Sequence, residues 1–258
     1  MDEIETATTR SADALIIGAN SGIATALCQQ WGRSSRFNAI HAVSRSPLKL
    51  DQIGSEPNTS GGGRVREYQC DHSESAISDV VASVFASKQN FSRIVIALGT
   101  LHGQGYQPEK SVNALTAFAM EEVYRINCVT PLLWLAKLAP QLRTQQDCRI
   151  AVLSARVGSI SDNDLGGWWS YRSSKAALNM ALKCSAIEFA RRARGVKLLA
   201  YHPGTVDTAL SAPFQRNVAS KKLFDPAFAA QSLDRVMDSL KLDGELSFLD
   251  WQGKPIAW

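Results

Sequence analysis

The chain alternates short apolar runs with segments whose apolar residues recur at helical spacing. Strands are predicted at residues 14–17, 38–43, 65–70, 93–99, 149–153, 196–201 and 247–251; most of these segments are apolar, whereas 65–70 also carries Arg66, Glu67 and Gln69. A run without polar alternation is typical of a strand that is buried on both faces of a sheet. Strands that alternate with helices predict an α/β fold, a doubly wound parallel sheet of about seven strands in a single domain over residues 1–258.

Three helical segments carry clear signals. Residues 77–85 place apolar side chains at i, i+3, i+4, i+7 and i+8, which predicts an amphipathic helix. The stretch 118–142 predicts a long helix with a kink at Pro131, because proline disrupts the helical hydrogen-bond ladder. Asp225 and Pro226 suit the N-cap and first position of a later helix, so a helix is expected to begin there.

Composition places the chain among soluble globular proteins. Of its 258 residues, 45% are hydrophobic and 20% are charged, which is enough apolar material for a sizeable core. The net charge of +4 is scattered, and the densest basic clusters, at residues 191–194 and 221–222, contain no interleaved aromatic residues. We therefore expect solvated helix ends or loops there and no nucleic-acid partner.

The cysteines and the N-terminus bear on the cellular compartment. Five cysteines lie far apart and form no Cys-x-x-Cys pair, which predicts buried, reduced thiols rather than disulfides or a metal site. The first five residues include three acids, and no apolar segment follows them, so no secretory signal is expected. No apolar run approaches the ~18 residues of a membrane span. These features predict a cytoplasmic protein without a membrane partner.

A glycine-containing turn joins the first predicted strand to a helix. Residues 18–24 read Gly-Ala-Asn-Ser-Gly-Ile-Ala, and Ile23, Leu27 and Trp31 then recur at helical spacing. Gly18 permits a tight turn, and Gly22 lets a pyrophosphate approach the backbone at the helix N-terminus. The turn therefore indicates a dinucleotide site, although an ordinary strand–helix turn has the same pattern.

The end of the second strand bears on which dinucleotide would bind. About 20 residues past the glycines, an acidic residue would bind the ribose hydroxyls of NAD. This chain has Ser44, Arg45 and Ser46 there instead. A guanidinium flanked by hydroxyls suits a 2′-phosphate, so NADP (NADPH) is the expected cofactor. The alternative is a solvent-facing arginine in a loop.

Tyr171 lies four residues before Lys175 at the start of an alanine-rich segment. On a helix these side chains share one face, and a nearby ammonium favours the phenolate. The spacing therefore predicts a tyrosine whose pKa lies below its usual value of about 10, suited to proton exchange with a carbonyl or hydroxyl group. The alternative is an ordinary surface pair.

These elements together resemble the short-chain dehydrogenase/reductase family over nearly the whole chain. The resemblance rests on the 18–24 turn, Asp71, Asn127, the Tyr171–Lys175 pair and the Pro-Gly-Thr-Val-Asp-Thr sequence at 203–208, in the family's order. Residues 156–167 and 255–258 are most similar to the C-factor-like subgroup. The resemblance implies a Rossmann-type fold and an NADP(H)-dependent enzyme that interconverts a carbonyl and an alcohol.

The resemblance also implies residue roles. Tyr171 would be the general acid, Lys175 would bind the nicotinamide ribose, and Asn127 would bend its helix and hold a water. Asp71 would lie at the border of the adenine. The nicotinamide would lie against Pro203, Gly204 and Val206, and Thr208 would lie near its carboxamide or the phosphates. The full set of expected cofactor contacts is Gly18, Asn20, Ser21, Gly22, Ile23, Ser44, Arg45, Ser46, Asp71, Leu98, Gly99, Asn127, Tyr171, Lys175, Pro203, Gly204, Val206 and Thr208.

The chain departs from the family pattern in four places. Ala24 replaces a glycine of the turn, and of the family's Asn-Asn-Ala-Gly only Gly99 remains after the fourth strand. The loop before Tyr171 is longer than usual. Counting back from Gly158 puts Ala155 at the catalytic serine position, with Ser154 before it. We expect Ser154 to be the hydroxyl that polarises the carbonyl, with Ser159 and Ser161 as possible substitutes.

These departures leave a second function open, in which the chain binds a dinucleotide with little turnover and acts as a redox sensor or signalling partner. Two further expectations concern surfaces. Trp168, Trp169 and Phe214 are candidates for an apolar substrate pocket, although tryptophans are also common in cores and interfaces. Small and apolar residues on the Tyr171 helix predict a homodimer or homotetramer: Ala176, Ala177, Met180, Ala181 and Cys184.

Overall fold

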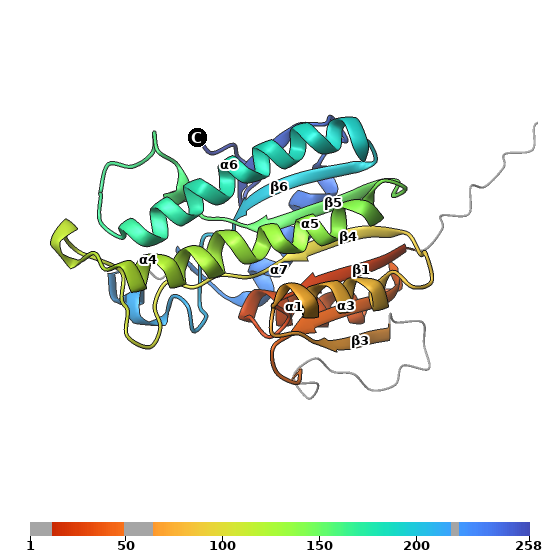
Figure 1. Cartoon of the computed structure of the whole chain (residues 1–258), viewed down its shortest axis with the longest axis horizontal. Coiled ribbons are helices and arrows are strands. Elements are labelled where there is room, and N and C mark those ends of the chain that lie inside the picture. The colour runs from red at the N-terminus through yellow and green to blue at the C-terminus, as the bar shows by residue number, and fades with distance from the viewer. Residues whose placement is uncertain (1–11, 49–63, 218–221) are drawn as a thin grey trace, which may run out of the picture.

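The computed structural model describes residues 12–48, 64–217 and 222–258, which form a twisted sheet covered by helices (Figure 1). The glycine-rich segment at 61–63 and Lys221 lie outside the described residues, so the loop predictions for them stay predictions. None of the helices in the described ranges is long and apolar enough to cross a membrane.

Seven parallel strands form the main sheet, which confirms the predicted fold class. Their spatial order is β3-β2-β1-β4-β5-β6-β9. The chain therefore runs outward from β1 on one side and from β4 on the other. Ligands bind at such a switch point in doubly wound sheets, beyond the carboxyl ends of the strands. The strands are β1 (Ala12–Ile17), β2 (Phe37–Ser44), β3 (Arg64–Gln69), β4 (Phe91–Ile96), β5 (Cys148–Leu153), β6 (Val196–His202) and β9 (Leu246–Asp250).

Helices cover both faces of this sheet and enclose two cores. One core packs α3 (Glu74–Val84), α5 (Thr130–Leu142) and α6 (Trp169–Arg192) against one face. The other packs α1 (Gly22–Gly32) and α7 (Pro226–Ser239) against the opposite face. Figure 1 shows α5 and α6 side by side across the sheet. The shorter elements are α4 (Ala117–Tyr124), the 3-10 turns at Val112–Ala114, Arg156–Gly158 and Ala212–Asn217, and the strands β7 (Thr205–Val206) and β8 (Leu223–Phe224).

The predicted long helix at 118–142 is interrupted, although not at the proline. A π-helical turn, Arg125–Val129, separates α4 from α5, and Pro131 lies in the first turn of α5. The backbone stays helical through Val129 and Thr130, so Pro131 leaves the preceding turn without one ladder hydrogen bond directly after the π turn. Asn127 sits inside the π turn, in agreement with its implied role of bending the helix.

Two other local predictions have clear outcomes. Asp225 caps α7, because its Oδ1 accepts a hydrogen bond of 2.8 Å from the Phe228 amide, and Pro226 is the first helical residue as expected. The prediction of buried thiols holds for four cysteines and is wrong for Cys184, which is exposed on α6.

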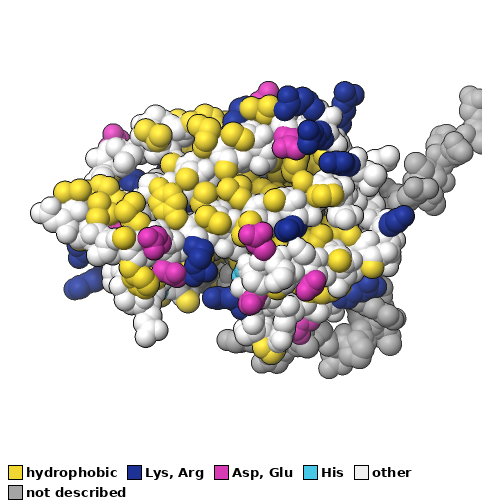
Figure 2. Space-filling model, in the orientation of Figure 1, with side chains coloured by type: hydrophobic (Ala, Val, Ile, Leu, Met, Phe, Trp, Pro, Cys, Tyr) yellow, Lys and Arg dark blue, Asp and Glu magenta, His cyan; other side chains and the backbone are white. Residues whose placement is uncertain are grey.

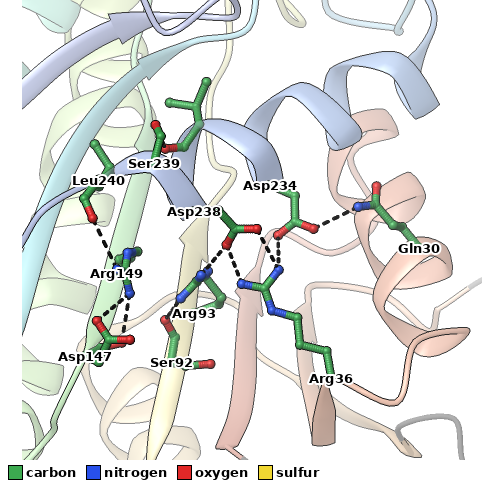
Figure 3. A network of polar contacts seen from close by, with 11 residues as sticks. Gln30, Arg36, Ser92, Arg93, Asp147, Arg149, Asp234, Asp238, Ser239 and Leu240 are labelled. Atoms are coloured by element: carbon green, nitrogen blue, oxygen red, sulfur yellow. Dashed lines mark hydrogen bonds and ion pairs between the residues drawn. The ribbon is translucent and has the colours of Figure 1, made fainter.

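An ionic network ties α7 to the sheet at the edge remote from the carboxyl ends of the strands (Figure 3). Asp234 of α7 accepts from Arg36 Nη1 at 3.2 Å. Asp238 of the same helix binds both Arg36 and Arg93, and Arg93 is almost fully buried on β4. Hydrogen bonds from the two guanidinium groups outweigh the effect of burial and lower the pKa of Asp238.

Two further cations extend this network across neighbouring strands. Arg149 of β5 is paired in register with Arg93 of β4 and with Lys197 of β6. Arg149 Nη2 donates to the Leu240 carbonyl at 3.2 Å, and Lys197 Nζ lies 2.5 Å from Asp243 Oδ1. Cations at this end complement the partial negative charge at the C-terminus of α7.

Candidate active site

The turn between β1 and α1 leaves a helix N-terminus open to an anion. Gly18 has φ +86°, and a Cβ there would lie 2.8 Å from the Ala97 carbonyl oxygen. A Cβ on Gly22 would lie 2.7 Å from the Thr208 side chain. Ser21 is the N-cap of α1, yet its side chain makes no cap bond and its buried hydroxyl has no partner among the described residues. This orphaned hydroxyl and the unpaired first-turn amides fit a pyrophosphate.

Asn20 fixes the neighbouring loop that follows β2. Its Nδ2 donates to the Ser46 carbonyl and hydroxyl, both at 3.0 Å, and to the Pro47 carbonyl at 3.1 Å. The Ser44 hydroxyl is buried and donates to the Ser46 carbonyl at 2.5 Å. Ser44 therefore shapes the loop rather than offering the open donor that was expected. Arg45 between them is exposed.

Arg45 lies near the predicted adenine end of the site. Burial is the main cause that lowers the pKa of His72, and the positive charge of Arg45 is the second. Asp71 is exposed, and the hydrogen bond that its Oδ1 accepts from the Ser73 amide at 2.8 Å lowers the pKa of its carboxyl group. The structure therefore brings Arg45 and the Asp71–His72 turn to one edge, where the adenosine end of a dinucleotide would lie.

Asn127 connects three elements beneath the site. Its Oδ1 accepts from the Thr100 amide at 2.7 Å, and its Nδ2 donates to the Thr100 carbonyl at 2.9 Å. The same Nδ2 donates to the Ser174 hydroxyl at 3.1 Å, and that hydroxyl donates to the Tyr171 carbonyl at 2.8 Å. A Cβ on Gly99 would lie 3.5 Å from Asn127 Oδ1 and 3.6 Å from Lys175 Nζ. The π turn, the loop after β4 and α6 therefore meet at Asn127.

Burial reverses the pKa direction that was predicted for Tyr171. The phenol is partly buried, and its burial raises its pKa to about 12. Burial also lowers the pKa of Lys175 to about 8. Lys175 Nζ donates to the Leu153 carbonyl at 2.7 Å, so the end of β5 holds the ammonium. The predicted lowering of the Tyr171 pKa is wrong, because burial is the cause of the shift and it disfavours the charged phenolate.

Ser154 is committed to a partner on α6. Its hydroxyl donates to Asn179 Oδ1 at 2.6 Å, and both side chains are buried. Asn179 lies eight residues after Tyr171, which is about 12 Å along a helix at 1.5 Å per residue. This contact runs against the expectation that Ser154 polarises the carbonyl, and it favours the register in which Ala155 faces the substrate.

The substitute serines are engaged elsewhere. The buried Ser159 hydroxyl accepts from the Asp162 amide at 3.1 Å, and the exposed Ser161 hydroxyl donates to the Trp258 carbonyl at 2.5 Å. Neither forms a hydrogen bond with Tyr171 among the described residues. Both hydroxyls therefore stabilise the loop between β5 and α6.

A row of aromatic rings leads to Tyr171 from the side. The Trp168 ring lies 6.2 Å from the Tyr171 ring and 5.4 Å from the Phe214 ring, measured between centroids. The Phe214 ring lies 5.7 Å from that of His102, whose Nε2 donates to the Ala209 carbonyl at 3.2 Å. Trp168 and Phe214 were candidate pocket residues, whereas His102 was missed. Trp169 is partly buried and takes no part in this row.

The segment after β6 completes the site. Gly204 has φ +78°, and a Cβ there would lie 2.6 Å from the Phe224 ring. Pro203 precedes it at the carboxyl end of β6. Val206 packs with Ile23 of α1, and Thr208 approaches Gly22 as described above. The predicted nicotinamide and pyrophosphate residues therefore converge from β1 and β6 on the same edge of the sheet.

The comparisons with known proteins agree with this geometry. A family model described as short chain dehydrogenase matches residues 12–219. The chain belongs to this family. Its members' fold appears in the NADPH-bound carbonyl reductase from chicken fatty liver, with a TM-score of 0.80 and 25% identity over 96% of this chain and 100% of that one.

Two curated relatives define the similarity within the family. The C-signal protein of Myxococcus xanthus is 32% identical over 139 residues, which cover 54% of this chain and 78% of that protein. A benzil reductase ((S)-benzoin forming) of Bacillus cereus is 22% identical over 254 residues, which cover 92% of this chain and 98% of that protein. The first similarity agrees with the predicted C-factor-like subgroup. This short-chain dehydrogenase is thus an oxidoreductase that acts on CH–OH or carbonyl groups.

Proposed function

We propose that the protein is an NADP(H)-dependent carbonyl reductase in which Tyr171 is the general acid and base. The observation that carries the proposal is the meeting of Asn127, Gly99 and Lys175 beside the helical turn that bears Tyr171. With a pKa of about 12, Tyr171 remains protonated at neutral pH and has a proton to donate to a carbonyl oxygen. Lys175, with a pKa of about 8, remains mostly charged there and stabilises the phenolate that forms.

The chain's own residues fit NADPH, which would supply the hydride for the carbonyl carbon when bound. The orphaned Ser21 hydroxyl and the N-terminus of α1 suit the pyrophosphate. Exposed Arg45 suits a 2′-phosphate. In this assignment Lys175 hydrogen-bonds the nicotinamide ribose, and Asn127 holds the loop after β4 against α6. The solved carbonyl reductase with the same fold is described as NADPH bound, which supports the choice of cofactor.

The aromatic row supports an aromatic or otherwise apolar substrate. Trp168 lies beside Tyr171, Phe214 extends this apolar surface beyond Trp168, and His102 adds a polar edge. Aromatic side chains offer large contact areas with favourable edge-to-face geometries for another ring. The relative named as a benzil reductase agrees with this substrate class. We expect such a carbonyl to enter beside Phe214.

A second function has a specific observation in its favour. Ala155 carries no hydroxyl, and the Ser154 hydroxyl is bound to Asn179. Loss of one oxyanion-type donor costs on the order of 10²–10³ in rate. A dinucleotide-binding protein with little turnover, acting as a redox sensor or signalling partner, would tolerate that loss. Unpaired, mostly buried cysteines support a reducing compartment such as the cytoplasm for either function.

A homodimer or homotetramer through α5 and α6 is part of the proposal. Figure 2 shows apolar side chains gathered over these two helices. Met180 is 67% exposed and Ile187 51% exposed, although both are apolar. Between the helices lies a groove that is lined by Leu132, Leu135, Ala136, Ala177, Met180 and Ala181. A second copy of the same face would cover this surface, because a two-fold interface is self-complementary.

A turnover panel tests the proposed function. Aromatic and aliphatic carbonyl compounds are incubated with NADPH and, separately, NADH, and cofactor absorbance is followed. We expect turnover with NADPH and an aromatic carbonyl, and less than a tenth of that activity in Tyr171→Phe, which keeps its NADPH affinity. Tight NADPH binding without turnover of any substrate would favour the sensor function. Activity above a tenth in Tyr171→Phe would exclude Tyr171 as the acid.

A further inference from the structure

The helix that carries Tyr171 begins without a cap of its own. Its N-cap is Trp168, which has the left-handed φ of +55° and makes no side-chain cap bond. Gly166 and Gly167 before it also have positive φ values, +61° and +68°. No acidic residue occupies the first turn of this 24-residue helix. The first amides of a helix need acceptors from outside, and its N-terminus favours a negative charge.

Glu109, more than fifty residues earlier in the chain, supplies these acceptors. One carboxylate oxygen, Oε2, accepts from the Ser170 amide at 3.2 Å, and Oε1 accepts from the Ser170 hydroxyl. The backbone carbonyl of Glu109 accepts from the Trp168 amide at 2.7 Å. Glu109 is 4% exposed and Ser170 is 2% exposed, so water does not replace these contacts. A buried carboxylate is retained only where donors offset its desolvation, as these do.

The contacts act directly beside Tyr171. Ser170 is the residue before it, and the ring of Trp168 packs edge-on against the phenol. The three hydrogen bonds that Glu109 accepts therefore fix the backbone on the N-terminal side of Tyr171. On the other side, the Asn127–Ser174 contact fixes the next turn.

Glu109 belongs to the loop after β4, which also contacts Asn127 and a residue after β6. This loop begins at Gly99 and Thr100, which meet Asn127, and continues through His102, which binds the Ala209 carbonyl. Thr100 and Tyr106 are also linked, with 2.8 Å between their hydroxyl oxygens. A displacement of the loop at Glu109 would therefore also displace the first turn of α6.

We propose that Glu109 is a positioning residue that caps α6 from the loop after β4 and thereby sets the location of the Tyr171 hydroxyl. This role rests on the proposed function of Tyr171. Because the carboxylate touches neither phenol nor cofactor residues, it acts on the chemical step through geometry. Its loss should change cofactor affinity little, because the pyrophosphate and 2′-phosphate residues lie on α1 and the loop after β2, and Lys175 is held separately by the Leu153 carbonyl.

Three variants test the proposal. Glu109→Ala removes both carboxylate contacts. Glu109→Gln restores them without charge, because its amide oxygen accepts from the Ser170 amide while its NH₂ donates to the Ser170 hydroxyl, which then acts as acceptor. Glu121→Ala is the matched control, since Glu121 is an exposed carboxylate on α4. Each is measured for kcat, substrate KM, NADPH affinity by fluorescence, and hydrogen exchange along α6.

We expect Glu109→Ala to lower kcat by roughly 10- to 100-fold, the scale of a small misplacement of a catalytic group. NADPH affinity should stay within about twofold and Glu109→Gln should regain most of the rate, as geometry rather than charge requires. Amide exchange at residues 169–174 should rise in Glu109→Ala while residues 180–192 and the control remain unchanged. A kcat within twofold of wild type in Glu109→Ala, or unchanged exchange at 169–174, would overturn the proposal. So would kcat and NADPH affinity that fall together as the protein unfolds. If wild type turns over no carbonyl, the proposed function fails, whereas the exchange result still decides whether Glu109 caps α6.

Discussion

The Ser154–Asn179 hydrogen bond provides a sharp test of how the end of β5 is oriented. Ser154→Ala removes the hydroxyl that donates to Asn179 Oδ1 at 2.6 Å. Ser154 is 4% exposed and Asn179 is 3% exposed, so water cannot readily replace the donor. An orphaned buried acceptor costs about 1–3 kcal/mol in the free energy of unfolding. In a chain of this size, 1 kcal/mol corresponds to roughly 2–4 °C in Tm, so we expect a fall of about 2–12 °C.

The same substitution should leave kcat within about threefold of the wild-type value, because the Ser154 hydroxyl is hydrogen-bonded to Asn179 of α6. Thermal unfolding and steady-state carbonyl reduction are measured together, with Ser83→Ala on α3 as the control for loss of an exposed helix hydroxyl. A kcat that falls by the 10²–10³ of a lost oxyanion donor, with Tm nearly unchanged, would refute this reasoning. In the register supported here, Ala155→Ser adds a donor at the substrate face and raises kcat by up to about 10²-fold.

Three further predictions concern cofactor choice, pH and assembly. Arg45→Ala should weaken NADPH binding by roughly 10- to 100-fold and leave NADH nearly unchanged, since one charge-assisted contact contributes about 1.5–3 kcal/mol; equal losses in a binding titration would contradict this. Burial lowers the Lys175 pKa to about 8, so the kcat/KM for carbonyl reduction should decline as the pH rises through about 8 and the ammonium loses its proton. A kcat/KM that stays level up to pH 10 would exclude Lys175 as the controlling group. Met180→Glu should dissociate the proposed homo-oligomer into single chains. If the wild type itself sediments with the 28.1 kDa mass of one chain, the proposed homo-oligomer does not exist.

Much of the fold could be predicted because its central strands are buried on both faces and appear in the sequence as apolar runs. The edge strand β3 is largely exposed and polar, yet it too was predicted, and all seven predicted segments became strands of the main sheet with shifted ends. The helix break was expected at Pro131, yet it occurs in the π turn around Asn127. Pro131 marks the neighbourhood of the irregularity, since it lies two residues after the π turn, but the sequence pattern does not specify a π turn at Arg125–Val129.

The site could be predicted where spacing fixes geometry and not where burial or a distant partner decides. Tyr171 and Lys175 share a helix face because they are four residues apart. The pKa of Tyr171 instead follows from how deeply the phenol is buried, which no spacing reveals. Ser154 turns towards Asn179, twenty-five residues later. His102 and Glu109 lie in a loop without periodicity, so no pattern marked them.

The in-register row of Arg93, Arg149 and Lys197 has a consequence for how the sheet assembles. On each strand the following residue points into the opposite core. A slip of β5 by one position would turn Arg149 towards the apolar side chains beneath α5 and α6, and would break its hydrogen bond to the Leu240 carbonyl. Parallel strands that are apolar on both faces have little else to distinguish one alignment from the next. These three cations thus favour the correct alignment of the strands, because a misaligned sheet would bury a cation among apolar side chains. The site at the opposite edge of the sheet depends on that alignment.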